Sequence, residues 1–302
     1  MKLPTKQKQI LEGHYGPVNV AYFNNDGQYV LSGGQDKSVK LWSILKDNQG
    51  EKGICLKTYT GHGREIYDIA ITNDNSKFAT CGGDKSVFLW DVMSGKTIRR
   101  FQGHYQRINC VDFNHEASVI VSGSNDMSIR IWDCRSNSRM PIQILEDAKD
   151  SITSLQVSDH EILASSVDGY IRIYDIRMGS LISDRIGLPI SYCSFSTDGN
   201  CILASSLNSK LYLIDKENGQ ILNSYEGHKN KEYKLISCLD NTDAYVISGS
   251  EDGKIIYWDL VDGTKAETVE AHKKVVTSVK YHPNNAYLLS ASHDGTIKIW
   301  ST

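Results

Sequence analysis

The stretch GHYQRINCVDFNHEASVIVSGSNDMSIRIWD, residues 103–133, decides the fold because similar stretches recur along the whole chain. Three strand-like runs lie within it, at residues 108–114, 119–122 and 129–132. Each run is apolar or alternates apolar with polar residues, and polar turns separate the runs, which is the pattern of short β-strands. The stretch is therefore one unit of a repeated β structure.

Four polar side chains sit at fixed offsets within this unit. Counting back from Trp132, Asp126 lies six residues upstream, Ser122 ten and His104 twenty-eight. The turn at residues 125–126 would bring the carboxylate back beside the imidazole. The carboxylate, imidazole, hydroxyl and indole N–H would then form one buried hydrogen-bonded chain, because a buried carboxylate is tolerated only with such partners. We call these four residues the tetrad and predict that it is a structural lock.

Seven copies of the unit cover nearly the whole chain. Their tryptophan-equivalent positions are Trp42, Trp90, Trp132, Tyr174, Ile214, Trp258 and Trp300. A Gly-His pair followed after about 28 residues by Trp-Asp resembles the WD-repeat β-propellers, whose repeat is roughly 40 to 45 residues long. The resemblance predicts an all-β, seven-bladed WD-repeat β-propeller that takes residues 1–302 as a single domain.

The tetrads differ in completeness from blade to blade. We expect complete structural tetrads in five blades: His14, Ser32, Asp36 and Trp42; His62, Thr80, Asp84 and Trp90; His104, Ser122, Asp126 and Trp132; His228, Ser248, Asp252 and Trp258; and His272, Ser290, Asp294 and Trp300. Blade 4 has Ala148, Ala164, Asp168 and Tyr174 at these positions, and blade 5 has Ile186, Ala204, Asn208 and Ile214. We expect blades 4 and 5 to be the least rigid part of the ring.

Two segments lie outside the regular units. Each unit supplies the outer strand of one blade and the three inner strands of the next, so the last blade lacks a fourth strand. Residues 1–12 precede the first unit, and we predict that residues 7–12 form that strand and close the ring. Residues 43–54 are a polar insertion with two glycines. The insertion is a surface loop that is either simply tolerated or used to bind a partner.

The composition of the chain argues against several classes of protein: nucleic-acid-binding, disulfide-rich or zinc-binding, secreted and membrane-spanning. The formal net charge is −3 and 23% of the residues are charged, so no basic surplus supports direct nucleic-acid binding. The seven cysteines are scattered without a CxxC pair, which favours a reducing compartment over a disulfide or zinc framework. The chain shows neither the apolar core of a signal peptide nor a membrane span. We expect a soluble, intracellular protein.

No constellation of side chains predicts an enzyme. The Asp-His-Ser grouping is similar in composition to a hydrolase triad, but it recurs five times with a tryptophan, whereas an enzyme needs one solvent-reachable nucleophile. The other histidines, His115, His160, His282 and His293, have no metal-ligand spacing. We expect no catalytic residue, no metal and no cofactor.

The surface remains as the place of function. Partners of WD-repeat propellers commonly bind the face formed by the loops that lead into each first strand and by the turns that carry the repeat Asp. Carried onto this sequence, the resemblance implies a partner-binding face made of Tyr15, Asn19, Gln35, Glu65, Tyr67, Arg107, Asn109, Asn125, Lys231, Tyr233, Glu251, Thr277 and His293. Tyrosine and arginine are frequent at interface hot spots. Any one of these residues could instead be merely solvated.

Three stretches carry a closer resemblance. These are SIRIWDCRS (128–136), VSDHEILASSVDGYIRIYDIRMG (157–179), and GHKNKEYKL with SEDGK (227–235 and 250–254). They resemble the mitogen-activated protein kinase organiser 1 family, also called WD-repeat protein 83, including its degenerate blade 4 and its two-residue insertion in blade 6. The resemblance implies a non-enzymatic scaffold for kinase-cascade components and for the pre-mRNA splicing machinery, present in cytoplasm and nucleus. We expect a monomer within larger complexes.

A second function comes from two short motifs. Trp132-Asp133-Cys134-Arg135 and Tyr174-Asp175-Ile176-Arg177 are similar to the WDxR box of propellers that act as substrate receptors for cullin-type ubiquitin ligases. Arg135 and Arg177 would then contact the ligase adaptor. Each arginine could instead complete a surface ion pair of little energetic consequence. The sequence leaves both possibilities open.

Overall fold

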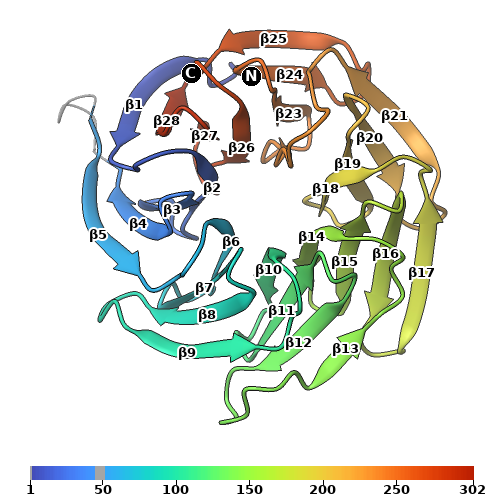
Figure 1. Ribbon diagram of the computed structural model, residues 1–302. Coiled ribbons are helices and arrows are strands. Elements are labelled where there is room, and N and C mark those ends of the chain that lie inside the picture. The colour runs from blue at the N-terminus through green and yellow to red at the C-terminus, as the bar shows by residue number, and fades with distance from the viewer. Residues whose placement is uncertain (1, 45–51) are drawn as a thin grey trace.

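The chain folds into a ring of seven antiparallel sheets around a central axis (Figure 1). The computed structural model describes residues 2–44 and 52–302, and within these residues it contains strands but no helix. Every sheet has four strands. The predicted all-β, seven-bladed propeller is confirmed.

The strands follow the repeat unit from blade to blade. Blades 1 to 3 consist of β2 (Val18–Phe23), β3 (Tyr29–Gly34), β4 (Ser38–Ser43) and β5 (Ile54–Thr60); β6 (Ile66–Ile71), β7 (Lys77–Gly82), β8 (Ser86–Asp91) and β9 (Thr97–Gln102); and β10 (Ile108–Phe113), β11 (Val119–Ser124), β12 (Ile129–Asp133) and β13 (Gln143–Leu145). Blades 4 and 5 consist of β14 (Ile152–Val157), β15 (Glu161–Ser166), β16 (Tyr170–Asp175) and β17 (Ser180–Arg185); and β18 (Ile190–Phe195), β19 (Cys201–Ser206), β20 (Lys210–Asp215) and β21 (Ile221–Glu226). Blade 6 consists of β22 (Cys238–Leu239), β23 (Tyr245–Gly249), β24 (Lys254–Asp259) and β25 (Lys265–Glu270), and blade 7 of β26 (Val276–Tyr281), β27 (Tyr287–Ser292), β28 (Thr296–Ser301) and β1 (Lys6–Glu12).

Burial explains why the inner strands are so apolar. Each inner strand lies between two neighbouring blades, so both of its faces are covered, as in β7, where every residue but the first is buried. The outer strands lie at the rim and bury few side chains, as in β9, where only Phe101 is buried. The core therefore sits between blades. One cluster, for example, packs Val39 of blade 1 against Ile66 and Phe78 of blade 2.

The N-terminal strand closes the ring. β1 pairs antiparallel with β28, with Leu11 opposite Ile297. Leu11 is 1% exposed, because this pairing seats it in the core between blades 7 and 1. Both ends of the chain consequently lie in one blade (Figure 1). The predicted closure by an N-terminal strand is confirmed, and the strand begins at Lys6.

The insertion at residues 43–54 lies partly outside the described residues, which omit residues 45–51. At its described end, Lys52 forms an isolated parallel bridge with Ile10 of β1, and the N–H of Gly53 donates to the Ile10 carbonyl at 3.0 Å. The Lys52 ammonium also lies 3.1 Å from the Glu12 carboxylate. This end of the insertion therefore rests against the closing strand. Partner binding by the insertion stays a prediction.

A β-bulge recurs near the start of the first, innermost strand of six blades. The register shifts leave one residue of each strand unpaired: Asn19, Tyr67, Asn109, Thr153, Ser191 and Thr277. A bulge redirects a side chain out of the regular alternation of a strand. In blade 6 the irregularity is larger, because β22 retains only two residues. These bulges position the candidate site.

Candidate functional site

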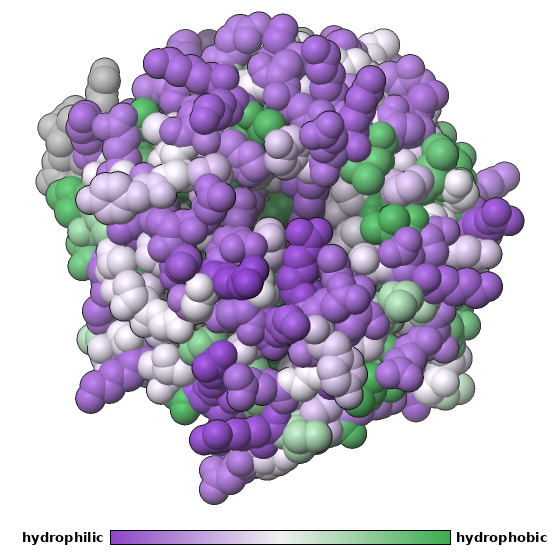
Figure 2. Space-filling model, in the orientation of Figure 1, coloured by the Kyte–Doolittle hydropathy of each residue, from purple (hydrophilic) through white to green (hydrophobic). Residues whose placement is uncertain are grey.

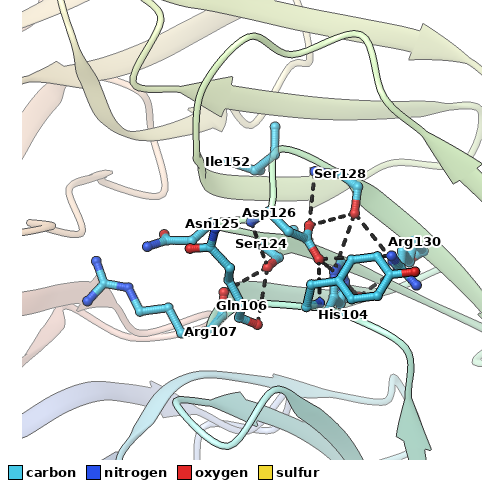
Figure 3. Close-up of polar contacts among 12 residues, drawn as sticks. His104, Gln106, Arg107, Ser124, Asn125, Asp126, Ser128, Arg130 and Ile152 are labelled. Carbon is cyan, nitrogen blue, oxygen red and sulfur yellow. Dashed lines mark hydrogen bonds and ion pairs between the residues drawn. The ribbon is translucent and has the colours of Figure 1, made fainter.

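Four tetrads form the expected hydrogen-bonded chain. Blade 3 serves as the example of its geometry, and Figure 3 shows the His104 and Asp126 part of it. His104 Nδ1 lies 2.8 Å from Asp126 Oδ2, and its Nε2 lies 2.8 Å from Ser122 Oγ, which is 2.9 Å from Trp132 Nε1. A carboxylate only accepts, so Nδ1 donates, Nε2 accepts the hydroxyl proton, and the hydroxyl oxygen accepts from the indole. The same contacts occur in blades 1, 2 and 7.

The carboxylate of each of these tetrads has further donors. The backbone N–H of Tyr105 donates to Asp126 Oδ2 at 2.9 Å, and the Ser128 hydroxyl donates to Oδ1 at 2.6 Å. Burial alone would raise the pKa of Asp126, but the bonds from His104, Ser128 and the Tyr105 backbone outweigh it and hold that pKa well below its usual range. Burial lowers the pKa of His104, which favours the neutral imidazole. The tetrad is thus a satisfied structural lock.

The expected tetrad of blade 6 does not form, which corrects the prediction from sequence. Neither ring nitrogen of His228 has a hydrogen-bond partner among the described residues, although both are buried. The Ser248 hydroxyl donates instead to the Gly249 carbonyl, and the Trp258 indole donates to the Glu226 carbonyl. Asp252 is exposed.

The tetrad of blade 6 is open because Asp252 lacks the hydrogen-bond donors that hold the carboxylate of the other tetrads. The intact tetrads in blades 1, 3 and 7 have a Ser or Thr hydroxyl two residues after the Asp that donates to the carboxylate. Blade 6 has Lys254 there, and its ammonium pairs with Glu270 at 2.9 Å. The N–H of Lys229, which follows the histidine, donates to Ser250 Oγ at 2.9 Å rather than to Asp252. Asp252 therefore loses both donors that would hold it inward.

Blade 4 replaces its missing histidine with a buried ion pair. Arg172 donates to Asp168 at 2.7 and 3.3 Å, and the two side chains are only 5% and 8% exposed. Burial alone would raise the pKa of Asp168, but Arg172, Ser166 and two backbone N–H groups lower it to about 2. A bidentate arginine pair fixes the geometry as the imidazole does elsewhere. Blade 5 contains neither arrangement, since Asn208 donates outward to the Tyr212 hydroxyl.

Several bulge residues clasp each blade to the next. The side chain of Asn19 donates to the Ile66 carbonyl at 2.7 Å, and that of Asn109 donates to the Ile152 carbonyl at 2.6 Å. Thr153 and Thr277 make the same bond to Ile190 and Val18 across their own junctions, each at 2.8 Å. Asn19, Asn109 and Thr277 were expected on the partner-binding face. Their polar groups hold neighbouring blades together, and Asn109 and Thr277 are buried; that they also meet a partner stays a prediction.

The clasps surround a cavity of about 610 Å³ on the face that carries the tetrad turns, which we call the upper cavity. Figure 2 shows hydrophilic side chains over much of the face around the axis. Among the residues expected on the partner-binding face, the upper cavity is lined by Asn19, Gln35, Glu65, Tyr67, Arg107, Asn109, Asn125, Tyr233, Thr277 and His293. Tyr15 is 89% exposed and lies outside this lining, as do Lys231 and Glu251.

Two clusters project from the rim of the upper cavity. The Arg107 guanidinium lies 5.3 Å from the centre of the Tyr67 ring, and the Tyr67 hydroxyl donates to Glu65 at 2.8 Å. Arg107 is exposed, and Figure 3 shows its side chain extending away from Asp126. Opposite, the Tyr233 ring meets His293 edge to face at 5.0 Å. The rim therefore offers aromatic faces, the exposed guanidinium of Arg107, and a carboxylate oriented by Tyr67.

Glu251 supports this rim rather than facing a partner. Its Oε1 atom accepts the backbone N–H groups of Lys231, Glu232 and Tyr233 at 2.7, 2.8 and 3.2 Å. These three residues belong to the loop after His228, which contains the two-residue insertion of blade 6. The carboxylate therefore fixes the loop that presents Tyr233.

A charged network beneath the upper cavity was missed from the sequence. Lys234 crosses the channel from blade 6, and its ammonium lies 3.3 Å from Asp68 of blade 2 and 2.9 Å from the Asn109 carbonyl of blade 3. The Tyr22 hydroxyl donates to Asp68 at 3.2 Å. Burial raises the pKa of Asp112, which also lies in the channel, to about 7. The sequence did contain one sign of this network, because Asp68 and Asp112 are charged residues within the otherwise largely apolar strands β6 and β10.

The two arginines of the WDxR motifs lie at the opposite end of the blades. Arg135 follows β12, which runs away from the tetrad turn, and its guanidinium lies 3.6 Å from Glu116, with both side chains 72% exposed. Arg177 is exposed and lines a second hollow of about 570 Å³ between blades 4 and 5. We call this side the lower face. Arg135 thus forms the surface ion pair that was the alternative to adaptor contact.

The comparisons with known proteins agree with the geometry. The family model described as WD domain, G-beta repeat matches residues 5–43, 53–91, 95–133, 139–175, 219–259 and 263–301. The chain is 50% identical over 299 residues to WD repeat domain-containing protein 83 of Rattus norvegicus, which covers 99% of this chain and 93% of the relative. The human protein of the same name is also 50% identical, over 301 residues, with the same coverage. A homologue from Dictyostelium discoideum is 36% identical over 321 residues, which are 97% of each chain.

The chain belongs to the WD-repeat protein 83 family. Between residues 176 and 218 the repeat model makes no match, and this stretch holds the inner strands of blade 5. The gap agrees with the loss of every tetrad residue there. In this chain blade 5 has therefore kept the fold without the lock.

Among the described residues no group of three or more His, Cys, Asp and Glu side chains is arranged to hold a metal ion. In the same part of the chain no helix is long and apolar enough to cross a membrane.

Proposed function

We propose that this chain is a non-enzymatic scaffold that binds partner proteins on the rim of its upper cavity. WD40 propellers generally mediate protein–protein interactions, and the chain has this fold. The observation that carries the proposal is the exposed Arg107 stacked on Tyr67, beside a carboxylate oriented by that tyrosine. Arg and Tyr held in this way are typical of binding hot spots.

Rigidity supports the same proposal. The clasps and the intact tetrads fix the backbone beneath the rim, so a partner meets side chains that are already ordered. Less conformational entropy is then lost on binding. A ring with an upper and a lower face can also hold two proteins at once, which raises their effective concentration to the order of mM.

The partners we propose follow from the resemblance to the mitogen-activated protein kinase organiser family. They are kinase-cascade components, spliceosomal proteins of the pre-mRNA splicing machinery, or both, met in cytoplasm and nucleus. Recognition through proteins rather than nucleic acid is consistent with the net charge of −3.

The test is a comparison of matched charge reversals on the two faces. Wild type, Arg107→Glu and Arg135→Glu would be purified from nuclear and cytoplasmic extracts after nuclease treatment, and the bound proteins identified. We expect Arg107→Glu to lose a defined set of partners that Arg135→Glu retains. Retention of the full set by Arg107→Glu, with an unchanged melting temperature, would refute the assignment of this rim.

The ligase-receptor function remains the alternative because Arg135 and Arg177 are both exposed on the lower face. It predicts that a cullin-ligase adaptor copurifies with the wild type and is lost from the Arg135→Ala/Arg177→Ala variant. Absence of any adaptor from the wild-type sample would exclude it under the conditions used.

A further inference from the structure

The open tetrad of blade 6 needs only small movements to close. The His228 ring lies 5.6 Å from the Trp258 ring, compared with 6.0 Å between His104 and Trp132 in the intact tetrad of blade 3. The imidazole is thus already beside its tryptophan. Rotation of the Ser248 hydroxyl and an inward turn of Asp252 would complete the chain. A buried imidazole without partners is unfavourable, so something must hold the tetrad open.

The segment that follows His228 supplies that restraint. From Lys229 onward the chain leaves blade 6 for the axis of the ring: Glu251 accepts three of its N–H groups, and Ile236 pairs in parallel with Ser278 of blade 7 instead of with β23. The N–H of Lys229 is consequently bound by Ser250 and is not available to Asp252. Ser250 and Glu251 therefore hold the loop on its route to the axis, and the same bond from Lys229 to Ser250 deprives Asp252 of a donor.

The far end of this loop is tied across the channel. Lys234 donates to the Asp68 carboxylate and to the Asn109 carbonyl, and its side chain is 22% exposed. Asp68 is itself ordered by the Tyr22 hydroxyl and by the N–H of Ile69. These oxygens form a preorganised acceptor site for one cation, and the loop of blade 6 fills that site with its own ammonium.

We propose that blade 6 is a two-state latch, in which seating of Lys234 on Asp68 and closure of the His228 tetrad exclude each other. A cationic group that takes Asp68 from Lys234 would release the loop, and His228 would then bind Asp252 and Ser248. Glu232, Tyr233 and Lys234 line the upper cavity, so closure of the tetrad changes the wall that a partner meets. Only this last consequence rests on the proposed function.

The experiment reads the imidazole of His228 directly. Nitrogen–proton NMR correlations of the histidine side chains report slowly exchanging Nδ1–H groups bonded to carboxylates, which the structure gives for His14, His62, His104 and His272. We expect a fifth such signal in Lys234→Met, where the ammonium is removed and the methylene stem retained. The signal should be absent from Lys234→Met/His228→Gln, which assigns it, and from Lys234→Met/Asp252→Asn.

Two further variants keep the result decisive. Asp68→Asn/Lys234→Met removes both members of the ion pair, so neither charge is left without the other, and it should show the same fifth signal if the single variant folds poorly. Lys231→Met removes an exposed ammonium from the same loop and should leave the four signals of the wild type. A folded Asp68→Asn/Lys234→Met protein with only four signals would overturn the latch. The outcome is independent of the partner experiment, because no partner is present in the sample.

Discussion

At the scale of single residues, one hydroxyl holds each lock together. Ser122 is fully buried and serves both the His104 imidazole and the Trp132 indole. Its removal would leave two buried polar groups without a partner. In blade 6 the equally buried Ser248 contacts only a neighbouring carbonyl. Ser122 and Ser248 are thus equally buried and occupy the same repeat position, but only the hydroxyl of Ser122 bridges two other side chains.

We expect Ser122→Ala to lower the free energy of unfolding by about 2–4 kcal/mol, since each orphaned buried group costs roughly 1–3 kcal/mol. Ser248→Ala should cost less than about 1 kcal/mol, because no other side chain depends on that hydroxyl. Urea denaturation of both variants and the wild type measures the difference. Equal losses would show that the hydroxyl of blade 3 has no bridging role.

The unpartnered imidazole of blade 6 should appear as a dependence of stability on pH. Burial lowers the pKa of His228 to about 4, whereas the unfolded chain binds the proton near pH 6.5. The unfolded state therefore holds more protons between pH 6.5 and 4, so stability falls as the pH falls through this window. We expect His228→Gln to remove up to about 1.4 kcal/mol per pH unit of that slope. Denaturant unfolding at pH 4.5 and 7 checks this, and parallel slopes would contradict it.

The sequence predicted the composition of the locks better than their closure. The repeat pattern, with two extra residues after His228, assigned His228, Ser248, Asp252 and Trp258 to the tetrad positions of blade 6, yet these residues do not form the chain. The missing information was the residue two positions after the Asp, which is Ser or Thr in the four closed tetrads and Lys254 in blade 6. The approach of Lys234 to Asp68 joins positions 166 residues apart, and no local pattern contains it.

At the scale of elements, the structure separates two blades that the sequence grouped together. Blade 4 retains a buried polar connection through Arg172 and Asp168, whereas blade 5 has no substitute for the tetrad. Both remain four-stranded sheets, because their inner strands are buried between neighbours. The stability of a blade therefore comes mainly from apolar packing, and the lock adds local rigidity.

We expect the backbone amides of β18 to β20 to exchange with deuterium faster than those of β6 to β8, with β14 to β16 between them. Local opening is easier where fewer buried polar connections hold the turns. Native-state hydrogen exchange resolved by mass spectrometry measures the order. Identical protection in blades 2 and 5 would contradict the role assigned to the locks.

The positions of the β-bulges could not be predicted from the sequence. Alternation of apolar and polar residues predicted that the inner strands exist, but it did not show where their register shifts. Asn19, Asn109 and Thr277 therefore looked like surface residues, although the bulges turn them toward the carbonyls of the next blade. Tyr67 occupies the bulge position of blade 2, but its hydroxyl donates to Glu65 on the rim.

At the scale of the whole molecule, closure depends on one strand. β1 seats Leu11 in the core and supplies the outer strand of blade 7. Deletion of residues 1–12 would expose the edge of β28 and part of the apolar core, and exposed edges promote aggregation. The repeat count predicted this closure because the last blade lacked its outer strand.

We expect a variant without residues 1–12 to aggregate, or to melt at a much lower temperature than the wild type. Lys6→Ala, which changes an exposed residue of the same strand, should behave like the wild type. Size-exclusion chromatography and thermal unfolding measure both. A monomeric deletion variant with an unchanged melt would show that β1 is dispensable.

The pairing of β1 with β28 also sets an order for biosynthesis. β1 leaves the ribosome before every other strand of the ring, and its partner leaves after all of them. The blades between them can form one after another as they emerge, since each is built mainly from neighbouring segments. The first strand has to wait for the last, and its apolar residues stay unprotected throughout translation. Slow elongation near residues 296–301 would therefore prolong the time in which a chaperone, or a second nascent chain, can capture it.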